Sequence, residues 1–380
     1  MKWETYKLKQ LCSEIVDCVN KTAPTSDVPT PYKMLRTSDI REGKINLENL
    51  NCVTKEVYEK WTRRGKLQKG DVIFTREAPL GEVGLVREEK NYFLGQRLVL
   101  FRANDKICDG RFLMYSLLWN DNKQAIISKG VGSTVAHLRV PECENIEIKA
   151  PDLDIQHRIA DILSAYDDLI ENNHKQIKLL KEAAQRLYKE WFVDLRFPGH
   201  ENTKIVDGVP EGWSRGLLKE LISVNYGKDH KKAPDDGNIP VYGSGGLMRK
   251  CNKSLFSGEA VLIPRKGSLN NIMYVDETFW TVDTMFYATM KQPHTAVFVY
   301  FFVKAFDMYS MNIGAAVPSM TTKILDAMDV VIPDKENLEK FDKYAKVYFN
   351  KIKTLQGQNE RLKIARDLLL PKLMSGEVEV

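Results

Sequence analysis

Basic side chains in and beside glycine-rich stretches are the residues of this chain best suited to hold a ligand. Lysine and arginine bind phosphate groups, and arginine can also donate two hydrogen bonds to the edge of a guanine. The candidates in the first half of the chain are Arg76, Arg97, Lys129, His137 and Arg139. The candidates in the second half are Lys228, Lys231, Lys232, Arg249, Arg265, Lys266 and Lys323. Each one taken alone is more simply a solvated surface charge, and the run 228–232 is the strongest candidate.

Patterns for catalysis or cofactor binding are weak or missing in the sequence. Glu147–Lys149 has the Glu-x-Lys form of a nuclease site, but no acidic partner stands at a convincing spacing. Gly243–Gly246 could cradle a phosphate, although such a glycine cluster is more often a turn. The chain has neither a Gly-x4-Gly-Lys-Ser/Thr phosphate loop nor the Pro-Pro pair with which methyltransferases of base amino groups hold a flipped base. The histidines and cysteines show no metal-ligand spacing. We therefore predict a non-catalytic chain with no metal and no cofactor of its own.

Length and composition describe an ordinary globular protein of more than one domain. The 380 residues exceed what one common core uses, and 43% hydrophobic with 28% charged residues is typical of soluble folds. The net charge of +5 permits a polyanionic partner without requiring one. No apolar run approaches the roughly 18 residues of a membrane span, and the N-terminal residues lack a signal-peptide core. Scattered cysteines are typical of reduced thiols, so a cytoplasmic protein is expected.

Two stretches of heptad-spaced apolar residues must position the candidate groups. Alternating steps of four and three predict a helix that buries a narrow stripe against another helix. The two helices are expected over 153–198 and 335–380. The seam of the first is Ile159, Leu163, Tyr166, Ile170, Asn173, Ile177, Leu180, Leu187 and Trp191. The seam of the second is Phe341, Tyr348, Ile352, Leu355, Asn359, Leu362 and Leu369.

The two seams are predicted to pack against each other in antiparallel directions. If facing residues have numbers that add to 532, every seam position meets a seam position, as Ile159 meets Leu373. Asn173 then faces Asn359, and such a buried pair fixes register at a cost in stability. The alternative is that both asparagines are solvated. Pro371 is predicted to kink or end the second helix, because a proline removes a helical hydrogen bond.

The chain is also an internal repeat. Residues 213–221 match residues 3–11 at an offset of 210, and residues 314–320 match residues 132–138 at an offset of 182. The second copy therefore lacks 210 − 182 = 28 residues, mostly before its central strands. The predicted fold is α+β, with two globular domains over 1–152 and 199–334 that two long antiparallel helices separate and a pseudo-two-fold axis relates.

Local patterns predict the elements of the first domain. Residues 70–76 and 81–86 read as a strand hairpin, and residues 93–101 read as one further strand. Residues 112–119 are expected to be helical. The aspartates of the Pro-Asp pairs at 151–152 and 333–334 are expected to precede the long helices, the first of them as a cap.

The chain resembles the specificity subunits of type I restriction–modification systems. The resemblance covers the whole chain and rests on the order of several stretches, which occurs twice. They are the domain start Pro210–Trp213, the stretch Ile239–Gly246, the glycine-rich segments before Pro151 and Pro333, the helix start Gln156–Ile159 and the ending Leu368–Gly376. The second helix departs from the pattern, because residues 338–341 stand where a Gln-x-x-Ile start is expected.

The resemblance implies a function in DNA recognition. Each globular domain would be a target-recognition domain that reads one half of a split, asymmetric site on double-stranded DNA. The paired helices would set the gap between the halves and dock two modification (methyltransferase) subunits. Those subunits would bind S-adenosylmethionine and methylate adenine at N6. Restriction subunits would use ATP and Mg²⁺ to translocate and cleave, and this chain would bind neither cofactor.

Two other classes of protein remain open from the sequence. One is a coiled-coil scaffolding protein without DNA recognition, which would show no salt-dependent binding to DNA. The other is a stand-alone enzyme acting on DNA, which would need activity from the purified chain alone.

Overall fold

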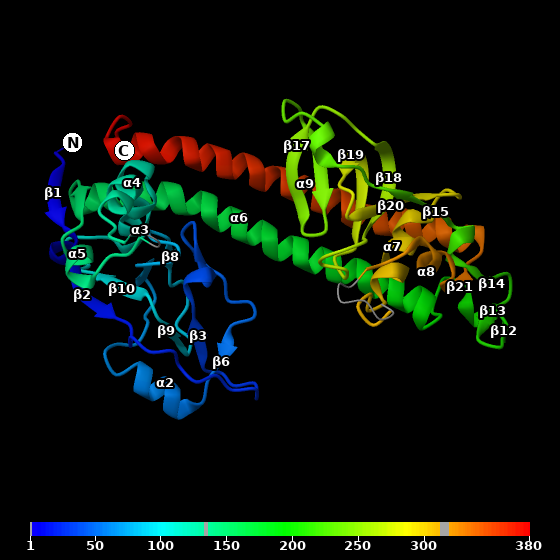
Figure 1. The fold of residues 1–380 in the computed structure, drawn as a ribbon, viewed down its shortest axis with the longest axis horizontal. Helices are drawn as coiled ribbons and strands as arrows, with labels where there is room; N and C mark the ends of the chain where they lie inside the picture. The colour runs from blue at the N-terminus through cyan, green and yellow to red at the C-terminus, as the bar shows by residue number, and fades with distance from the viewer. Residues whose placement is uncertain (1, 133–135, 312–318) are drawn as a thin grey trace. The chain divides into compact units, whose positions relative to one another are not determined.

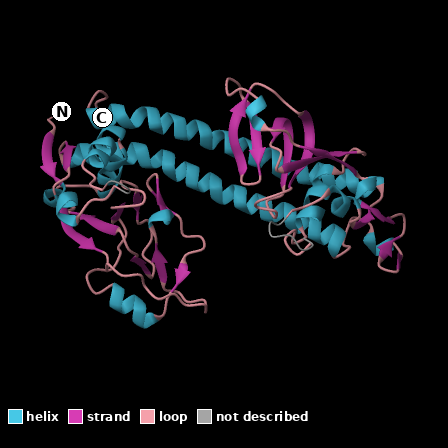
Figure 2. Ribbon diagram, in the orientation of Figure 1, coloured by secondary structure: helices cyan, strands magenta, loops and turns pink. Residues whose placement is uncertain are grey.

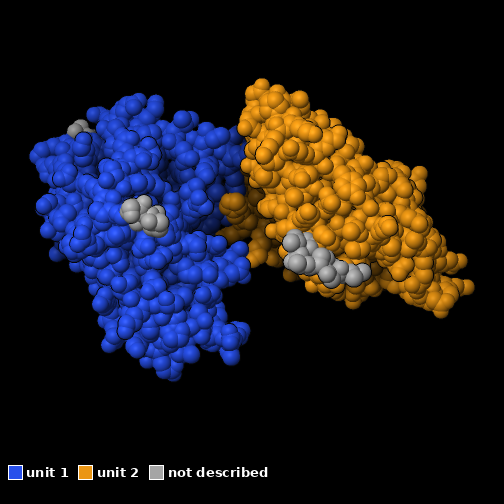
Figure 3. Space-filling model, in the orientation of Figure 1, with its two compact units in different colours: residues 1–172, 358–380 blue, residues 173–357 orange. Residues whose placement is uncertain are grey.

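Two compact units make up the chain in a computed structural model, which describes residues 2–132, 136–311 and 319–380. Unit 1 comprises residues 1–172 with 358–380, and unit 2 comprises residues 173–357 (Figure 3). The glycine-rich match between 132–138 and 314–320 lies largely outside the described residues, since 133–135 and 314–318 are not among them. In the described parts of the chain, none of the helices combines the length and the apolar content that a membrane span requires.

Two long helices, α6 (Leu153–Tyr188) and α9 (Lys335–Ser375), each contribute residues to both units. Both begin at the predicted Pro-Asp pairs. The Asp152 carboxylate accepts a hydrogen bond from the Ile155 amide at 3.1 Å, and the Asp334 carboxylate accepts one from the Asn337 amide at 2.9 Å. Each bond satisfies an amide that a helix start leaves without a partner. A π-helical turn, Lys189–Val193, follows α6.

Inside each unit the two helices run antiparallel, as the sequence predicted. In unit 1, Ile159 near the start of α6 and Leu373 near the end of α9 belong to one hydrophobic cluster. In unit 2, Trp191 packs its ring 6.0 Å from that of Phe341 near the start of α9. Every predicted seam residue is buried or half-buried. Asn173 and Asn359 are both buried but belong to different units, so their pairing stays a prediction.

The sequence predicted that Pro371 would kink or end the second helix, and the structure shows that the helix does not end there. Helix α9 continues past Pro371 to Ser375, and Leu373 and Met374 beyond it are buried in the core of unit 1. A proline inside a helix costs about 3 kcal/mol, whereas burying two such side chains contributes roughly 1.5–3 kcal/mol each. Packing therefore holds the last turn in place.

Unit 1 is built from small sheets covered by helices (Figures 1 and 2). Its four-stranded sheet has the order β2 (Cys12–Asp17), β10 (Leu98–Ala103), β7 (Val72–Thr75) and β8 (Val83–Leu85). A three-stranded sheet has the order β6 (Asn51–Cys52), β3 (Lys33–Leu35) and β9 (Tyr92–Leu94). Strand β1 (Glu4–Lys7) pairs with β11 (Glu147–Ala150), and β4 (Ile40–Arg41) pairs with β5 (Lys44–Ile45). The helices are α1 (Leu8–Leu11), α2 (Lys55–Trp61), α3 (Gly110–Leu118), α4 (Asn120–Ser128) and α5 (Val140–Glu144). Helix α3 starts at Asp109, whose carboxylate accepts from two backbone amides, and packs on the four-stranded sheet.

Unit 2 repeats this plan with one larger sheet. The strand order is β15 (Ile222–Tyr226), β20 (Met285–Met290), β18 (Phe256–Pro264), β19 (Met273–Thr281), β16 (Ile239–Gly243) and β17 (Gly246–Cys251). Strand β14 (Ser214–Leu217) pairs with β21 (Asp329–Ile332), and β12 (Ile205–Val206) pairs with β13 (Val209–Pro210). The helices are α7 (Ala296–Lys304), which packs on β18 and β19, and α8 (Thr322–Asp326).

The strand orders confirm the internal repeat. The order β2-β10-β7-β8 of unit 1 corresponds to β15-β20-β18-β19 of unit 2, and the pair β1–β11 corresponds to β14–β21. Strand β3 pairs in parallel with β9, and its counterpart β16 pairs in parallel with β19. Helix α2 lies between β6 and β7, while in unit 2 the chain passes from β17 at Cys251 to β18 at Phe256 with no helix between. This difference accounts for much of the predicted loss of residues before the central strands.

The single strand predicted over 93–101 is wrong, because the structure contains two strands there. Strand β9 ends at Leu94 and β10 begins at Leu98. Between them Arg97 has φ +70°, and a Cβ on Gly95 would lie 2.3 Å from the Leu35 carbonyl oxygen. A left-handed residue and a close backbone approach turn the chain between two sheets, and an apolar pattern on either side does not reveal such a turn.

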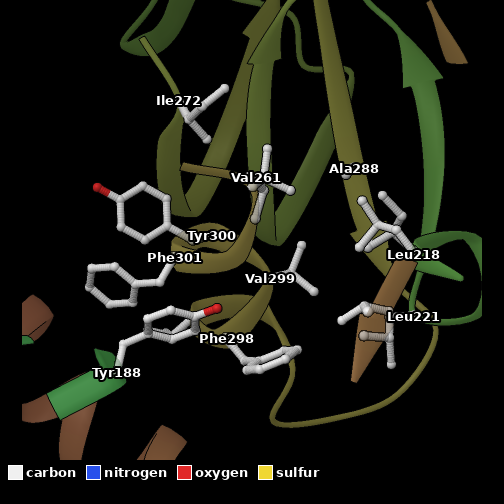
Figure 4. Close-up of a cluster of buried hydrophobic side chains, with 14 of the residues drawn as sticks. Tyr188, Leu218, Leu221, Val261, Ile272, Ala288, Phe298, Val299, Tyr300 and Phe301 are labelled. Atoms are coloured by element: carbon white, nitrogen blue, oxygen red, sulfur yellow. The ribbon is translucent and has the colours of Figure 1, made fainter. Parts of the chain in front are cut away.

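The core of unit 2 joins its sheet to both long helices. Its aromatic side chains come from α7 (Phe298, Tyr300 and Phe301), from α6 (Tyr188) and from α9 (Phe341). Figure 4 shows the Tyr188 ring beside those of Phe298 and Phe301, and their ring centroids are 5.9 and 5.4 Å away. These contacts hold the helices and the sheet of unit 2 together as one core.

Candidate nucleic-acid interface

The basic candidates of unit 1 gather at one end of its four-stranded sheet. The Arg76 amide, just after β7, donates to the Arg97 carbonyl at 2.8 Å, and the Leu138 amide donates to the Arg76 carbonyl at 3.0 Å. His137 forms an isolated bridge with Glu77. We call residues 17–18, 76–82, 95–97 and 136–139 the first loop cluster. It contains Arg76, Arg97, His137 and Arg139, while Lys129 is the exposed C-cap of α4 close by in the chain.

The arginines of the first loop cluster are already paired with carboxylates. The Arg76 guanidinium lies 3.0 Å from Asp17, donates to the Leu138 carbonyl at 3.2 Å, and is only 16% exposed. Arg97 lies 3.3 Å from Glu77, and Arg139 lies 3.4 Å from Glu142. Pairing lowers the net charge that this cluster offers to a polyanion. Arg76 therefore acts mainly inside the fold, whereas Arg97 and Arg139 remain on the surface.

The basic candidates of unit 2 gather at the corresponding end of its sheet. The Lys228 amide donates to the Thr281 carbonyl at 2.9 Å, and the Arg265 amide donates to the Thr284 carbonyl at 2.8 Å. The Asn271 side chain donates to the Ser244 carbonyl at 2.9 Å. We call residues 226–228, 242–246, 265–271 and 281–284 the second loop cluster. Met320, whose amide donates to the Arg265 carbonyl at 2.9 Å, brings α8 and its exposed Lys323 to the same place.

Charge is less compensated in the second loop cluster than in the first. Lys228, Lys266 and Lys323 are exposed, and among the described residues no carboxylate lies within ion-pair distance of them or of Arg265. Lysines and arginines in this state are the groups that displace counterions from a phosphate backbone. The second loop cluster is therefore the stronger candidate for binding a polyanion.

The run that looked strongest in the sequence is divided by the structure. Lys228 lies in the second loop cluster, whereas Lys231 and Lys232 are exposed on the neighbouring loop before β16. Arg249 holds that loop in place, because its guanidinium forms an ion pair with Asp235 and donates to the carbonyls of His230 and Ala233. Arg249 thus supports the loop that carries the two lysines.

One functional candidate was missed by the sequence reasoning. Tyr226 ends β15 with its side chain 53% exposed, and the Arg265 guanidinium lies 5.5 Å from the centre of its ring. The signal in the sequence is an aromatic residue directly before Gly227 and Lys228. It became meaningful only when the fold placed Arg265, 39 positions later, against it.

The weak catalytic patterns have structural explanations. Gly243–Gly246 is the turn between β16 and β17, with Gly246 at φ +112°. Glu147 and Lys149 lie in β11, paired with Lys7 and Thr5. In the parts of the chain that the structure describes, no three His, Cys, Asp or Glu side chains are placed to share a metal ion.

An aspartate–histidine pair lies beside a cavity of about 400 Å³ in unit 2. The His294 Nδ1 atom is 2.8 Å from Asp342, but Lys346 is also 2.8 Å from that carboxylate. Thr289 is a hydroxyl residue of the cavity lining, and its hydroxyl donates to the Ser223 carbonyl at 3.4 Å. A nucleophile needs to reach the base that activates it, and no described contact joins this hydroxyl to His294. The pair is better explained as a link between α9 and the loop before α7.

Known proteins share both the sequence pattern and the fold. The family model described as "Type I restriction modification DNA specificity domain" matches residues 1–182 and 210–363. A relative named type I restriction enzyme MjaIX specificity subunit, from Methanocaldococcus jannaschii, is 25% identical over 353 residues, which cover 82% of this chain and 78% of the relative. The HindI specificity subunit of Haemophilus influenzae is 22% identical over 444 residues, covering 90% and 94%.

A solved structure has the same fold. It is the crystal structure of a type I restriction–modification system S subunit from M. genitalium, with a TM-score of 0.61 and 19% identity. The match covers 98% of this chain and 96% of that one.

Proposed function

The chain belongs to the family of type I restriction–modification DNA specificity domains and is a specificity subunit of such a system; from this premise we propose that its two repeats each read one half of a bipartite, asymmetric DNA site. The observation that carries the proposal is the repeated placement of a basic loop cluster at the same end of the same strand order. The two clusters differ in charge pairing and in side chains. Unlike clusters imply unlike half-sites, because base edges are read by individual side chains.

We assign each proposed role to a continuous range of residues. Residues 1–152 and 199–334 are the target-recognition domains, and residues 153–198 and 335–380 form the helical spacer. Ten of the twelve basic candidates named above supply phosphate and base contacts, whereas Arg76 and Arg249 hold loops in place. The chain itself is a non-catalytic recognition subunit and works where genomic DNA is, in the cytoplasm.

The partners are two modification (methyltransferase) subunits and restriction subunits. S-adenosylmethionine binds to the former, and ATP with Mg²⁺ binds to the latter. Exposed apolar side chains on the long helices support docking, since contiguous apolar patches mark interaction sites and neighbouring positions of a helix face lie three or four residues apart, as Ile364 and Leu368 do. They are Leu169, Ile364 and Leu368 in unit 1, and Leu179, Tyr344 and Val347 in unit 2.

The decisive experiment compares DNA methylation in the host with and without the gene for this chain. We expect a split, asymmetric motif that contains methyladenine in the parent strain and loses it on deletion. Restoring the gene should restore the motif. If the motif is present in both strains, another specificity subunit makes it and the proposal fails. A scaffold without DNA recognition predicts the same failure, and a stand-alone enzyme predicts activity from the purified chain alone.

A second experiment tests the helices as the element that sets the gap. Seven residues are inserted into α6 between residues 172 and 173 and into α9 between residues 357 and 358, where both helices pass from one unit to the other. One heptad adds about 10 Å to a helix, which is about three base pairs of B-DNA. We expect the unspecified gap of the methylated motif to grow by that amount while both half-sites stay unchanged.

The matched control inserts the same seven residues at the exposed turn between Asp207 and Gly208, inside unit 2. This insertion should leave the gap unaltered. A gap that stays constant with the paired helix insertions, in a complex that still methylates DNA, would show that the helices do not set the spacing.

A further inference from the structure

Arg76 and Arg265 occupy the same place in the two repeats. Each follows the last residue of a central strand: Thr75 of β7 pairs with Leu98, and Pro264 of β18 pairs with Met285. The backbones of the two arginines make the same hydrogen bonds. Their amides donate to the carbonyls of Arg97 and Thr284, each of which lies just before the paired strand. Their carbonyls accept from the amides of Leu138 and Met320, which lie in the segments before the last strand of each repeat.

The side chain that holds each arginine also comes from an equivalent place. Asp17 is the last residue of β2 and pairs with Val99, while Tyr226 is the last residue of β15 and pairs with Phe286. The first repeat thus sets a carboxylate beside its arginine, at 3.0 Å, and the second sets an aromatic ring beside it, at 5.5 Å. The exchange of Asp for Tyr changes which N–H groups of the guanidinium remain free to bind a ligand.

A carboxylate occupies the hydrogen-bond donors of a guanidinium, whereas an aromatic ring contacts its flat face. Arg76 is ion-paired with Asp17, and its mostly buried guanidinium donates to the Leu138 carbonyl and to the Cys18 sulfur. Arg265 is held in orientation by a cation–π contact, which leaves the five N–H donors at its edge available. A fixed guanidinium with a free donor edge matches the O6 and N7 acceptors of guanine.

The surroundings of Arg265 favour a nucleic-acid contact. Tyr226 is itself more than half exposed, and Lys228, Lys266 and Lys323 are exposed in or beside the same loop cluster. Lysines of this kind place a duplex through its phosphates but carry no sequence information. The arginine fixed among them is the group that can read a base.

We propose that Arg265, held on the face of Tyr226, reads a guanine in the half-site of the second repeat, and that Arg76 serves the first repeat as an internal tie. This assignment rests on the proposed function, because it presumes that unit 2 binds one half of the site. It adds a named base-reading group and a functional difference between the two repeats.

The test uses the chain assembled with its modification subunits and duplexes that carry the methylated motif. Arg265→Ala should weaken binding to that duplex about 5- to 150-fold. Discrimination should relax at one G·C pair in one half-site and stay intact in the other half. Arg265→Lys keeps the charge but lacks the planar donor fork and the flat face that packs on Tyr226, so it should relax the same position. Tyr226→Leu should act in the same direction with a smaller effect.

A change in the DNA tests the contact without touching the protein. Replacing that guanine by 7-deazaguanine removes the N7 acceptor, so it should weaken binding by the native complex and have little added effect on Arg265→Ala. Arg215→Ala is the matched control, since Arg215 is an exposed arginine of unit 2 on β14, outside the six-stranded sheet. It should leave binding unchanged.

Two results would overturn the assignment while leaving the proposed function intact. One is site-specific binding by Arg265→Ala equal to that of the native complex. The other is an equal loss of affinity for all DNA sequences, with a salt dependence of binding that falls by about one phosphate contact. That result would mean that Arg265 contacts a DNA phosphate and not a base. A native complex that shows no preference for its own motif would instead overturn the proposed function itself.

Discussion

Replacing Asp167 by alanine should destabilise unit 1 by about 3 kcal/mol, at the lower end of what breaking a buried ion pair costs. Asp167 on α6 is 5% exposed and pairs with Arg366 on α9, which is 9% exposed. The Tyr115 hydroxyl donates to the same carboxylate at 2.5 Å. Without Asp167, a buried guanidinium and a buried hydroxyl lose a partner. Arg366 keeps its second partner, the half-exposed Asp367, which limits the loss.

The ionisation of this network supports that expectation. Burial lowers the pKa of Arg366, but the charges and hydrogen bonds of Asp167 and Asp367 together more than offset this, so that the pKa lies above its ordinary value. Burial first, and then the charge of Asp167, raise the pKa of Tyr115 well above the usual range of tyrosine. Asp167 therefore favours the charged form of the arginine and the neutral form of the tyrosine, and both groups lose this stabilisation when it is removed.

Calorimetry and hydrogen exchange measure the effect of Asp167→Ala. A loss of 3 kcal/mol corresponds to a fall in Tm of roughly 6–12 °C for a unit of this size, and faster exchange should be confined to unit 1. Asp168→Ala is the matched control, because Asp168 is the next residue, is 63% exposed and shares Arg87 with Glu171. It should cost less than about 1 kcal/mol. Equal effects of the two substitutions would contradict a buried pair.

A double replacement separates charge from packing. Asp167→Leu with Arg366→Met removes both charges and keeps apolar volume, and such exchanges are often neutral or stabilising. The double variant should therefore be more stable than Asp167→Ala. If it is less stable, the pair contributes more through its hydrogen bonds than through avoiding an unpaired charge.

Replacing Phe341 by alanine should destabilise unit 2 by about 3–5 kcal/mol. Phe341 on α9 is fully buried. Its ring centroid lies 4.8 Å from Phe192, 6.0 Å from Trp191 and 6.3 Å from Tyr188. The substitution leaves a cavity in the core of unit 2, between the end of α6 and the start of α9. Tryptophan fluorescence of Trp191 should report the loosened packing, and urea unfolding should give the loss in free energy.

Val347→Ala on the same helix is the control for Phe341→Ala. Val347 is 64% exposed, so its truncation should change stability by no more than about 0.5 kcal/mol. Phe341→Leu should lie between the two, because it keeps part of the buried volume. A cost for Phe341→Ala below about 1 kcal/mol would mean that the aromatic cluster rearranges to fill the space.

Much of the fold was visible in the sequence for a local reason. A heptad pattern reports which face of a helix is buried, so α6 and α9, their antiparallel direction and the repeat could be predicted from spacing alone. The prolines and aspartates at 151–152 and 333–334 marked the helix starts because capping uses the residue next to the helix. Basic residues beside glycines marked segments that the fold then brought to one end of each sheet.

Other features were decided only by tertiary structure. The division of 93–101 into two strands depends on the approach of Gly95 to the Leu35 carbonyl, and the passage of α9 through Pro371 depends on the burial of Leu373. Asp167 lies one position off the predicted seam, and its partner Arg366 is 199 residues away. No periodic pattern specifies such a pair.

The difference between Arg76 and Arg265 shows the same limit at the candidate interface. Both arginines follow a strand in a similar local sequence, and the sequence does not reveal what either guanidinium contacts. Their roles separate only because Asp17 faces one and Tyr226 faces the other. Periodicity determines which face of an element is buried, but the partner of a polar side chain is set by whichever distant residue the packed fold places beside it.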